Sequence, residues 1–444
     1  MADRDVDSAV KDWISANIGP VRTIERHQRW RPAWFVTADR GDREVGLYVR
    51  GDREGFGFAG VKVEAEIYRV LEEHQIPVPH VYGEIDEASA IVMDLLPGAP
   101  NPCLTDDPHE VDAVMDSYVD ALVRTHSIDP AAFAGLDIPD GPRALALDNF
   151  ETFVTRYREF KQRPEPLLEF AIGWLRRNAP THRSTPSFVL GDTGQYMYAD
   201  GRITGLIDVE LAHIGDVAHD LAGLRLRNAT EPMGDLGRVL RRYQEVSGTP
   251  LDRAAIEFHT AKFALCTPLG ITIVLHLDLP LTDIVQYIEW FHQLSLHAIE
   301  SIAQQAGVEL SAVSLPDPEP TPYPGAVAGL ASMVESLEVP TGIAEYERSS
   351  VARAARFSHR VAEYAHAIET ADLDDIADLI GVRPAIRAAG DQALEEFIHT
   401  ASPEHDEALI TLLHRRVMRQ LLMMEPLLTD GRIAHVTPLD ELLG

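Results

Sequence analysis

The 444-residue sequence contains only two cysteines, Cys103 and Cys266, and they do not have the spacing of metal ligands. Two thiols are too few for a disulfide framework, so a reducing compartment fits best. The sequence also lacks the basic start and apolar run of a secretory signal peptide, and no stretch approaches the length of a membrane span. These absences predict a cytoplasmic protein that does not associate with membranes.

Positive charge is also scarce. Lys and Arg total 39 against 70 Asp and Glu, which gives a formal net charge of −31. Such a field repels nucleic acids and anionic membrane surfaces, so we expect no nucleic-acid partner. With 45% hydrophobic and 25% charged residues, the composition is that of an ordinary globular protein. A phosphate-binding site in so acidic a chain needs local arginines or metal ions, which draws attention to the arginine-rich segment 22–53.

Two acidic residues follow short apolar segments in the stretch 188–222, which reads FVLGDTGQYMYADGRITGLIDVELAHIGDVAHDLA. The segments 188–190 and 203–207 have the pattern of strands, and they run into Asp192 and Asp208. If the strands are neighbours, the two carboxylates converge. Converging carboxylates usually bind a divalent cation, or divide the roles of general base and metal ligand, because unpaired they would repel. This stretch therefore predicts a chemical site.

The same stretch resembles the catalytic cassette of the aminoglycoside phosphotransferase and choline kinase-like superfamily, which has a protein-kinase-like fold. The matching residues are Gly191-Asp192, Ile207-Asp208, Gly215-Asp216 and Asp220-Leu221-Ala222. The resemblance implies that Asp192 is catalytic and orients or deprotonates the acceptor hydroxyl. It also implies that Asp208 holds Mg²⁺ against the phosphates of ATP, and that Asp220 braces the catalytic loop from the next helix.

The sequence departs from the family pattern at two places in this cassette. Leu190 stands where the family has a histidine, and the loop after Asp192 is two residues shorter. Gln195 therefore occupies the expected place of a metal-binding Asn, which makes it the second predicted metal ligand beside Asp208. Gln also offers an amide oxygen, but Mg²⁺ tolerates little deviation from octahedral geometry.

The N-terminal third carries the predicted nucleotide-binding residues. The alternating segments 33–37 and 45–49 flank turn residues 39–42 and predict a hairpin, and 61–74 has the pattern of a helix. By the resemblance, Arg50 replaces the family's phosphate-contacting Lys, and Glu64 is its ion-pair partner. The other interpretation places Arg50 and Arg31 on a solvated or salt-bridged surface.

A formal Gly-x-Gly-x-x-Gly match spans residues 55–60, between these two elements. Residues 52–54 separate it from the preceding strand, which favours a simple loop over a dinucleotide site. The segment 90–96 reads as a strand that ends at Pro97-Gly98. By the resemblance, it leads into the hinge between two lobes, where the backbone near Asp94 and Leu96 binds the adenine edge. His126, at the end of the next helix, is interpreted as structural.

The predicted fold is α+β: a two-lobed protein-kinase-like fold with an additional C-terminal all-helical domain. Residues 1–97 form an N-lobe of antiparallel strands plus one helix, and 98–312 form a helical C-lobe with the catalytic cassette. The proline-rich segment 313–325 reads as a linker. Residues 326–444, outside the resemblance, form a helical domain that could dock a second copy or a partner protein.

The resulting hypothesis is an ATP- and Mg²⁺-dependent phosphotransferase that acts on a hydroxyl of a small molecule. The alternative is a catalytically degenerate member of the fold that binds a nucleotide, metabolite or protein partner without transferring phosphate. Leu190, the short loop and the replacement of Lys by Arg50 suggest this alternative, because phosphoryl transfer needs several positioned groups at once. The sequence leaves the acceptor undetermined.

Overall fold

The computed structural model describes residues 3–27, 31–52, 60–101, 105, 107–276, 283–318, 320 and 323–444. Cys103 and the glycine-rich match at 55–60 lie outside the described residues, apart from Gly60. Apart from the last two residues, the chain divides into two compact units. Unit 1 contains residues 1–141 and 184–251, and unit 2 contains 142–183 and 252–442. The residues predicted to form a site all belong to unit 1.

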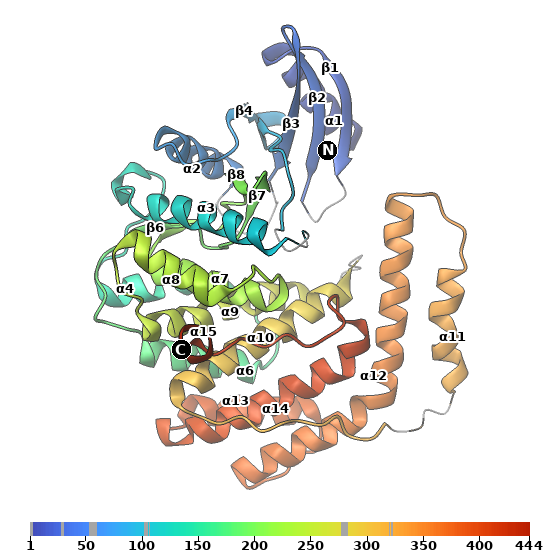
Figure 1. The fold of residues 1–444 in the computed structure, drawn as a ribbon. Helices are drawn as coiled ribbons and strands as arrows, with labels where there is room; N and C mark the ends of the chain where they lie inside the picture. The colour runs from blue at the N-terminus through green and yellow to red at the C-terminus, as the bar shows by residue number, and fades with distance from the viewer. Residues whose placement is uncertain are drawn as a thin grey trace. The chain divides into compact units, whose positions relative to one another are not determined.

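A five-stranded antiparallel sheet forms the N-terminal part of unit 1 (Figure 1). Its order is β1-β2-β3-β5-β4, and its strands are β1 Val21–His27, β2 Ala33–Arg40, β3 Arg43–Gly51, β4 Val81–Ile85 and β5 Ala90–Asp94. The predicted hairpin is confirmed, because β2 pairs with β3. Gly41, at the turn, has φ 65°, a left-handed conformation that glycine adopts without strain.

The two faces of this sheet carry different helices. Val10 and Ile14 of α1 (Asp3–Asn17) share one buried apolar cluster with Trp34 and Val49 of the sheet. Because side chains alternate along a strand, Arg50 lies on the face opposite to Val49. On that side it meets α2 (Val61–Glu73), the predicted helix. The alternation along β3 therefore places a charged side chain on one face of the strand, while the other face packs into the apolar core.

The remainder of unit 1 contains helices and two small sheets. The elements are α3 Pro108–His126, β6 Ser187–Val189, β7 Tyr196–Ala199, β8 Arg202–Leu206, β9 His213–Gly215, α7 Val217–Thr230 and α8 Leu236–Ser247, with short 3-10 helices at Asp86–Ala88 and Pro130–Ala132. Strand β6 pairs with β9, and β7 pairs with β8. The expectation that the strands before Asp192 and Asp208 are neighbours is therefore wrong, because each pairs with a strand that the sequence pattern did not assign to it.

Unit 2 is helical in its described residues. Its helices are α4 Pro142–Leu147, α5 Phe150–Phe160, α6 Pro166–Asn178, α9 Arg253–Leu275, α10 Ile284–Ala306, α11 Pro324–Glu335, α12 Ile343–Ile380, α13 Arg387–Thr400, α14 Asp406–Met424 and α15 Leu439–Leu443, with 3-10 turns at Pro403–His405 and Glu425–Leu427. Helix α9 packs along α10, and α10 contacts α12 and α14. The predicted α+β class is thus confirmed, with an antiparallel N-terminal sheet and a large helical remainder.

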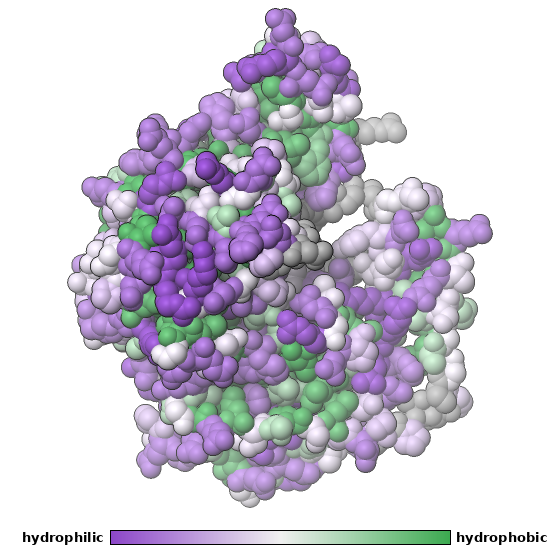
Figure 2. Space-filling view, in the orientation of Figure 1, coloured by the Kyte–Doolittle hydropathy of each residue, from purple (hydrophilic) through white to green (hydrophobic). Residues whose placement is uncertain are grey.

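One described helix, α9, is long and apolar enough to cross a membrane, but 72% of its apolar window is buried in the structure. Lys262, in the middle of this helix, forms a fully buried ion pair with Asp148. A helix in the core of a globular unit can hold such a buried ion pair in its middle. Hydrophilic residues predominate on the molecular face in Figure 2.

Candidate active site

Arg50 and Glu64 form a buried ion pair between β3 and α2. Nε of Arg50 lies 2.9 Å from Oε2 of Glu64, and the two residues are 6% and 0% exposed. The interpretation of Arg50 as a surface residue is therefore wrong. The structure brings the predicted pair together, whereas its contact with phosphate stays a prediction.

Arg31 joins the same cluster, so the interpretation that placed it on the surface is wrong for this residue as well. Its Nη2 lies 3.2 Å from Oε1 of Glu64, and its Nη1 lies 2.6 Å from Oε2 of Glu210. Its Nε donates to the carbonyl oxygen of Gly51 at 3.0 Å. Arg31 is 4% exposed, because three acceptors replace the water it would lose on burial. No pattern within the segment 26–34 reveals these partners, which come from three other segments.

Asp208 follows β8 and points its carboxylate at Arg50. Its Oδ1 lies 2.5 Å from Nη2 of Arg50, and Oε2 of Glu210 lies 3.2 Å from the same nitrogen. Asp208 has φ 58°, a left-handed conformation that is uncommon for a residue with a side chain. Such conformations concentrate at functional sites, where surrounding structure holds them in place.

The charges in this cluster are unequal, since the three carboxylates of Glu64, Asp208 and Glu210 share two guanidinium groups. Burial and, second, the neighbouring Asp208 carboxylate raise the pKa of Glu210 to about 7, although Arg50 and Arg31 oppose the shift. Burial likewise raises the pKa of Glu64 against the pull of both arginines. Burial disfavours the charge on Arg50, but Asp208 and Glu64 raise its pKa above the usual value. The cluster therefore keeps its cations and holds one more carboxyl group than guanidinium groups, a surplus that protonation of Glu210 or a further cation would offset.

A second group of contacts surrounds Asp192, after β6. Gln195 donates from Nε2 to Oδ2 of Asp192 at 2.9 Å, and Arg227 donates from Nη2 to Oδ1 at 2.6 Å. Both carboxylate oxygens thus hold a donor. The backbone oxygen of Gln195 accepts from the N–H of Ile207 at 3.1 Å, next to Asp208 in the chain. Gln195 therefore connects the loop of Asp192 to the segment that carries Asp208.

Asp220, in the first turn of α7, holds the loop that contains Asp192. Its Oδ2 accepts from the backbone N–H of Leu190 at 2.8 Å, and its Oδ1 accepts from the N–H of Gly191 at 3.0 Å and the hydroxyl of Thr193 at 2.8 Å. Burial opposes ionisation, but His126, His219 and the backbone N–H of Leu190 hold the pKa of Asp220 below its ordinary value. These contacts are the bracing role that the resemblance implied.

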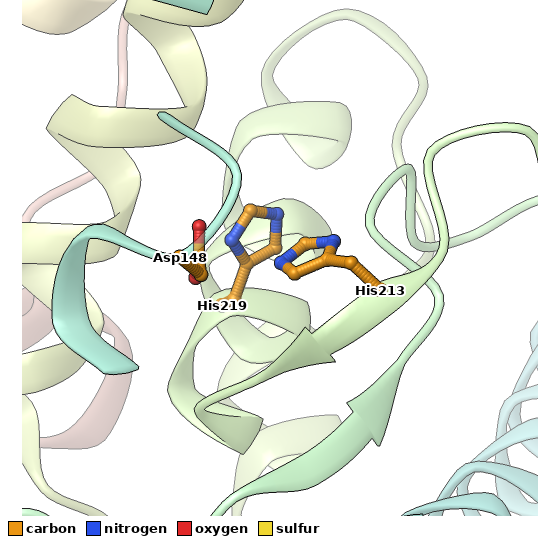
Figure 3. Close-up of side chains that lie close together, drawn as sticks. All are labelled: Asp148, His213 and His219. Atoms are coloured by element: carbon orange, nitrogen blue, oxygen red, sulfur yellow. The ribbon is translucent and has the colours of Figure 1, made fainter. Parts of the chain in front are cut away.

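Two histidines support the same loop, His126 through Asp220 and His219 by a direct contact. His126 lies with Nε2 2.9 Å from Asp220 and Nδ1 2.8 Å from the hydroxyl of Tyr243, so its position is structural, as predicted. His219 lies with Nε2 3.2 Å from the carbonyl oxygen of Gly191. Its ring meets that of His213 edge to face, with centroids 4.9 Å apart (Figure 3). The loop of Asp192 therefore has a histidine contact, from His219, although Leu190 stands where the family has a histidine.

The predicted hinge residues contact residues outside both groups described above. Asp94 accepts from the hydroxyl of Tyr82 at 2.8 Å, and its backbone N–H donates to His80 at 3.0 Å. Leu96 packs against Gly205, where an added Cβ would come within 2.6 Å of its Cδ1. Within the described part of the chain, the backbone N–H and C=O of Leu96 have no hydrogen-bond partner. Leu96 could therefore offer a free backbone edge to a ligand.

Comparison with known proteins places this geometry in a family. Residues 27–259, more than half of the 444-residue chain, match the model of the phosphotransferase enzyme family, APH. No curated protein matches the chain significantly. The matched residues include every member of the two groups of contacts described above.

Two solved structures show the same fold. A protein of Ralstonia eutropha JMP134, predicted to be an aminoglycoside phosphotransferase, aligns with a TM-score of 0.52 and 16% identity over 66% of this chain and 97% of its own. A thermostable mutant of APH(4)-Ia, in ternary complex with AMP-PNP and hygromycin B, aligns with a TM-score of 0.51 and 16% identity over 68% of this chain and 100% of its own. At this identity the likeness shows the fold alone, and it confirms the kinase-like architecture. From the family match and this fold, the chain belongs to the phosphotransferase enzyme family.

Proposed function

We propose that this protein is an ATP- and Mg²⁺-dependent phosphotransferase that transfers the γ-phosphoryl group to a hydroxyl of a small molecule. The observation that carries the proposal is the position of Arg50, which bridges Glu64 of α2 and Asp208 after β8. In the kinase fold, a cation on this strand, its helix partner and a metal-binding Asp act together on the phosphates. APH(4)-Ia, solved with AMP-PNP and hygromycin B, supports a nucleotide and a small-molecule acceptor.

The residues around Asp208 fit a magnesium ion by their chemistry. Mg²⁺ prefers hard oxygen ligands, usually one or two carboxylates together with phosphates. Asp208 supplies a partly exposed carboxylate, in a cluster where three carboxyl groups surround two guanidinium groups. The side chain of Gln195 donates its Nε2 hydrogen to Asp192, which leaves its amide oxygen for a cation. When bound, Mg²⁺ would neutralise charge on the transferred phosphoryl group.

The chain's own residues divide the remaining work. Arg50 stays charged and presents a planar fork to phosphate oxygens, so it can leave Asp208 for a phosphate when a cation takes its place. The free backbone edge of Leu96 can bind the adenine ring. Asp192 orients the attacking hydroxyl and accepts its proton, while Asp220 keeps the loop in position.

A second candidate function has its own support in the loop of Asp192. Both oxygens of this carboxylate are engaged, by Arg227 and Gln195, so an acceptor hydroxyl must share or displace a donor. Leu190 also replaces the family's histidine. These two features favour a member of the fold that binds a nucleotide without transferring phosphate.

Calorimetric titration with ATP, with and without Mg²⁺, tests the proposal first. We expect magnesium-dependent binding that is lost in Asp208→Ala and retained in Glu73→Ala, which removes an exposed acid at the end of α2. ADP release with panels of hydroxyl compounds then tests transfer. Binding without ADP release from any panel would support the non-catalytic candidate, and absence of binding would contradict both.

A further inference from the structure

Arg227, near the C-terminal end of α7, is a buried cation beside the predicted catalytic residue. Its Nη2 donates to Oδ1 of Asp192 at 2.6 Å, its Nε to the carbonyl oxygen of Thr193 at 2.9 Å, and its Nη1 to Oε2 of Glu231 at 2.9 Å. Only 14% of its side chain is exposed. The guanidinium group of Arg227 thus donates to the carboxylate of Asp192, to the backbone carbonyl oxygen of the next residue and to an exposed carboxylate. A Lys ammonium, a compact point charge, could not span these three acceptors with the same planar geometry.

The short loop after Asp192 is shaped to admit this side chain. Gly194 has φ +93°, and a Cβ added to it would come within 2.6 Å of Cδ and 3.0 Å of Nε of Arg227. A residue other than glycine would therefore be strained in its backbone and would collide with the arginine. The backbone N–H of Gly194 donates to the hydroxyl of Tyr118 at 3.0 Å, which fixes the loop from α3. The short loop after Asp192 and the absence of a side chain at Gly194 therefore leave the space that Arg227 occupies.

As a result, both oxygens of the Asp192 carboxylate are held by hydrogen bonds. Arg227 holds Oδ1 and Gln195 holds Oδ2, so rotation about the side-chain bonds would break a hydrogen bond in either direction. A fixed carboxylate matters in phosphoryl transfer, because the attacking oxygen must approach in line with the leaving group. A misplacement of about 1 Å can cost 100-fold in rate.

We propose that Arg227 is the positioning residue of Asp192: it holds the carboxylate, from α7, in the single orientation that aligns the acceptor hydroxyl. This inference rests on the proposed function, and it adds to the cassette a residue that lies outside its motifs. Arg227 acts through Asp192. Its removal should therefore change the rate of transfer and leave nucleotide affinity almost unchanged.

The first test measures the Arg227–Asp192 pair without any activity. Thermal unfolding is followed for Arg227→Met, Asp192→Asn, and the double variant, with Glu231→Gln as the matched control that removes the charge of the exposed partner of Arg227. We expect Arg227→Met to lower Tm by about 5 °C, because it leaves a partly buried carboxylate without its cation. The double variant should fall by clearly less than the sum of the single shifts. Additive shifts would overturn the proposal.

The second test measures the rate with ATP and Mg²⁺, using water as the acceptor and ADP release as the signal. We expect kcat to fall about 100-fold in Arg227→Met with KM for ATP within about twofold of the wild type. Arg227→Lys should recover part of the loss, Glu231→Gln should stay within about twofold, and the double variant with Asp192→Asn should be no slower than the slower single variant.

Two results of the rate measurement would overturn the proposal: an unchanged kcat in Arg227→Met, or a change confined to KM, which would make Arg227 a nucleotide-binding residue. A wild-type protein that binds ATP and releases no ADP with water or any hydroxyl acceptor contradicts the proposed function instead. In that case the unfolding cycle decides whether Arg227 holds Asp192, since it needs no turnover. Non-additive shifts there support the pairing, and additive shifts overturn it.

Discussion

Nη2 of Arg50 lies 2.5 Å from Oδ1 of Asp208, and this contact joins the N-terminal sheet to the segment after β8. The residues are 158 positions apart in the chain. Glu64 holds the same guanidinium from α2. Because Glu64 fixes the guanidinium group from α2, Arg50 should lose less orientational freedom when a phosphate takes the place of Asp208.

Replacing Arg50 with Met should destabilise the protein and abolish ATP binding. The variant leaves Glu64, Asp208 and Glu210 with Arg31 as the remaining cation among the described contacts of the cluster. Loss of one partner from such a buried group costs about 3–5 kcal/mol of unfolding free energy. Urea unfolding measures this loss of unfolding free energy.

The matched control for this prediction is the double variant Arg50→Met with Glu64→Gln. It removes the unpaired charge together with the cation, so we expect it to be more stable than Arg50→Met alone. If both variants unfold at the same urea concentration, the unpaired charge of Glu64 is not the cause of the lost stability.

Asp220 should make the protein sensitive to acid. Because its folded pKa is below its unfolded value, its contribution to stability is complete above the unfolded pKa of about 4 and is lost as the pH falls through the folded pKa. In Asp220→Asn, stability at neutral pH should fall by several kcal/mol, because a buried carboxylate that accepts from two backbone N–H groups is lost.

Unfolding free energy measured from pH 3 to pH 7 checks the Asp220 prediction. The wild type should lose more stability over this range than Asp220→Asn does. His126→Gln is the informative companion, since it removes one donor to Asp220 and keeps the carboxylate. Parallel curves for the wild type and Asp220→Asn would show that Asp220 titrates alike in the folded and unfolded states.

Local patterns predicted most of the elements around the site and missed some of their pairing. The hairpin of β2 and β3 and the helix α2 follow from periodicity, because their burial repeats every two or about every four residues. The pairing of β6 with β9, by contrast, depends on strands of three residues each, which carry too few alternations to show a pattern. The predicted domain boundaries stay predictions.

The residues of the candidate site likewise divide into those that local patterns predicted and those that they missed. Asp192, Asp208 and Asp220 stand out because they occupy motif positions, and the structure holds each in a network of contacts. Arg31 was noted only as part of the arginine-rich segment 22–53, and Arg227 did not stand out, because an arginine outside a motif looks like any surface cation until its distant acceptors are known. Their partners are set by the tertiary fold, which is invisible to spacing along the chain.

Gly194→Ala should disturb the loop of Asp192 more than an ordinary surface substitution. Alanine is strained at φ +93°, and its Cβ would meet Cδ of Arg227 at 2.6 Å. Strain of this kind costs about 1–3 kcal/mol. Thermal unfolding of Gly194→Ala beside Gly248→Ala, which also has positive φ but no atom within 4 Å of its added Cβ, separates strain from collision. Equal losses in both variants would mean that Arg227 gives way freely.

Gln195 has one observed contact, with Asp192, and one predicted contact, with the metal, and substitutions can separate them. Gln195→Glu keeps the length and an oxygen, but it cannot donate to Asp192 and places a second carboxylate beside it. Gln195→Leu removes both contacts. If the amide oxygen ligates Mg²⁺, Gln195→Leu should weaken binding of AMP-PNP with Mg²⁺ about 10-fold while leaving metal-free AMP-PNP binding unchanged.

Gln195→Glu decides how the metal is held. Added carboxylate charge near Asp208 should strengthen Mg²⁺ binding if residue 195 faces the ion, so this variant should bind AMP-PNP with Mg²⁺ at least as tightly as the wild type. Its kcat should nevertheless fall, because Oδ2 of Asp192 loses its donor. Calorimetry with and without Mg²⁺ measures the first effect and ADP release the second. Equal binding by the wild type, Gln195→Leu and Gln195→Glu would leave Asp208 as the protein's sole predicted metal ligand and assign Gln195 to the orientation of Asp192.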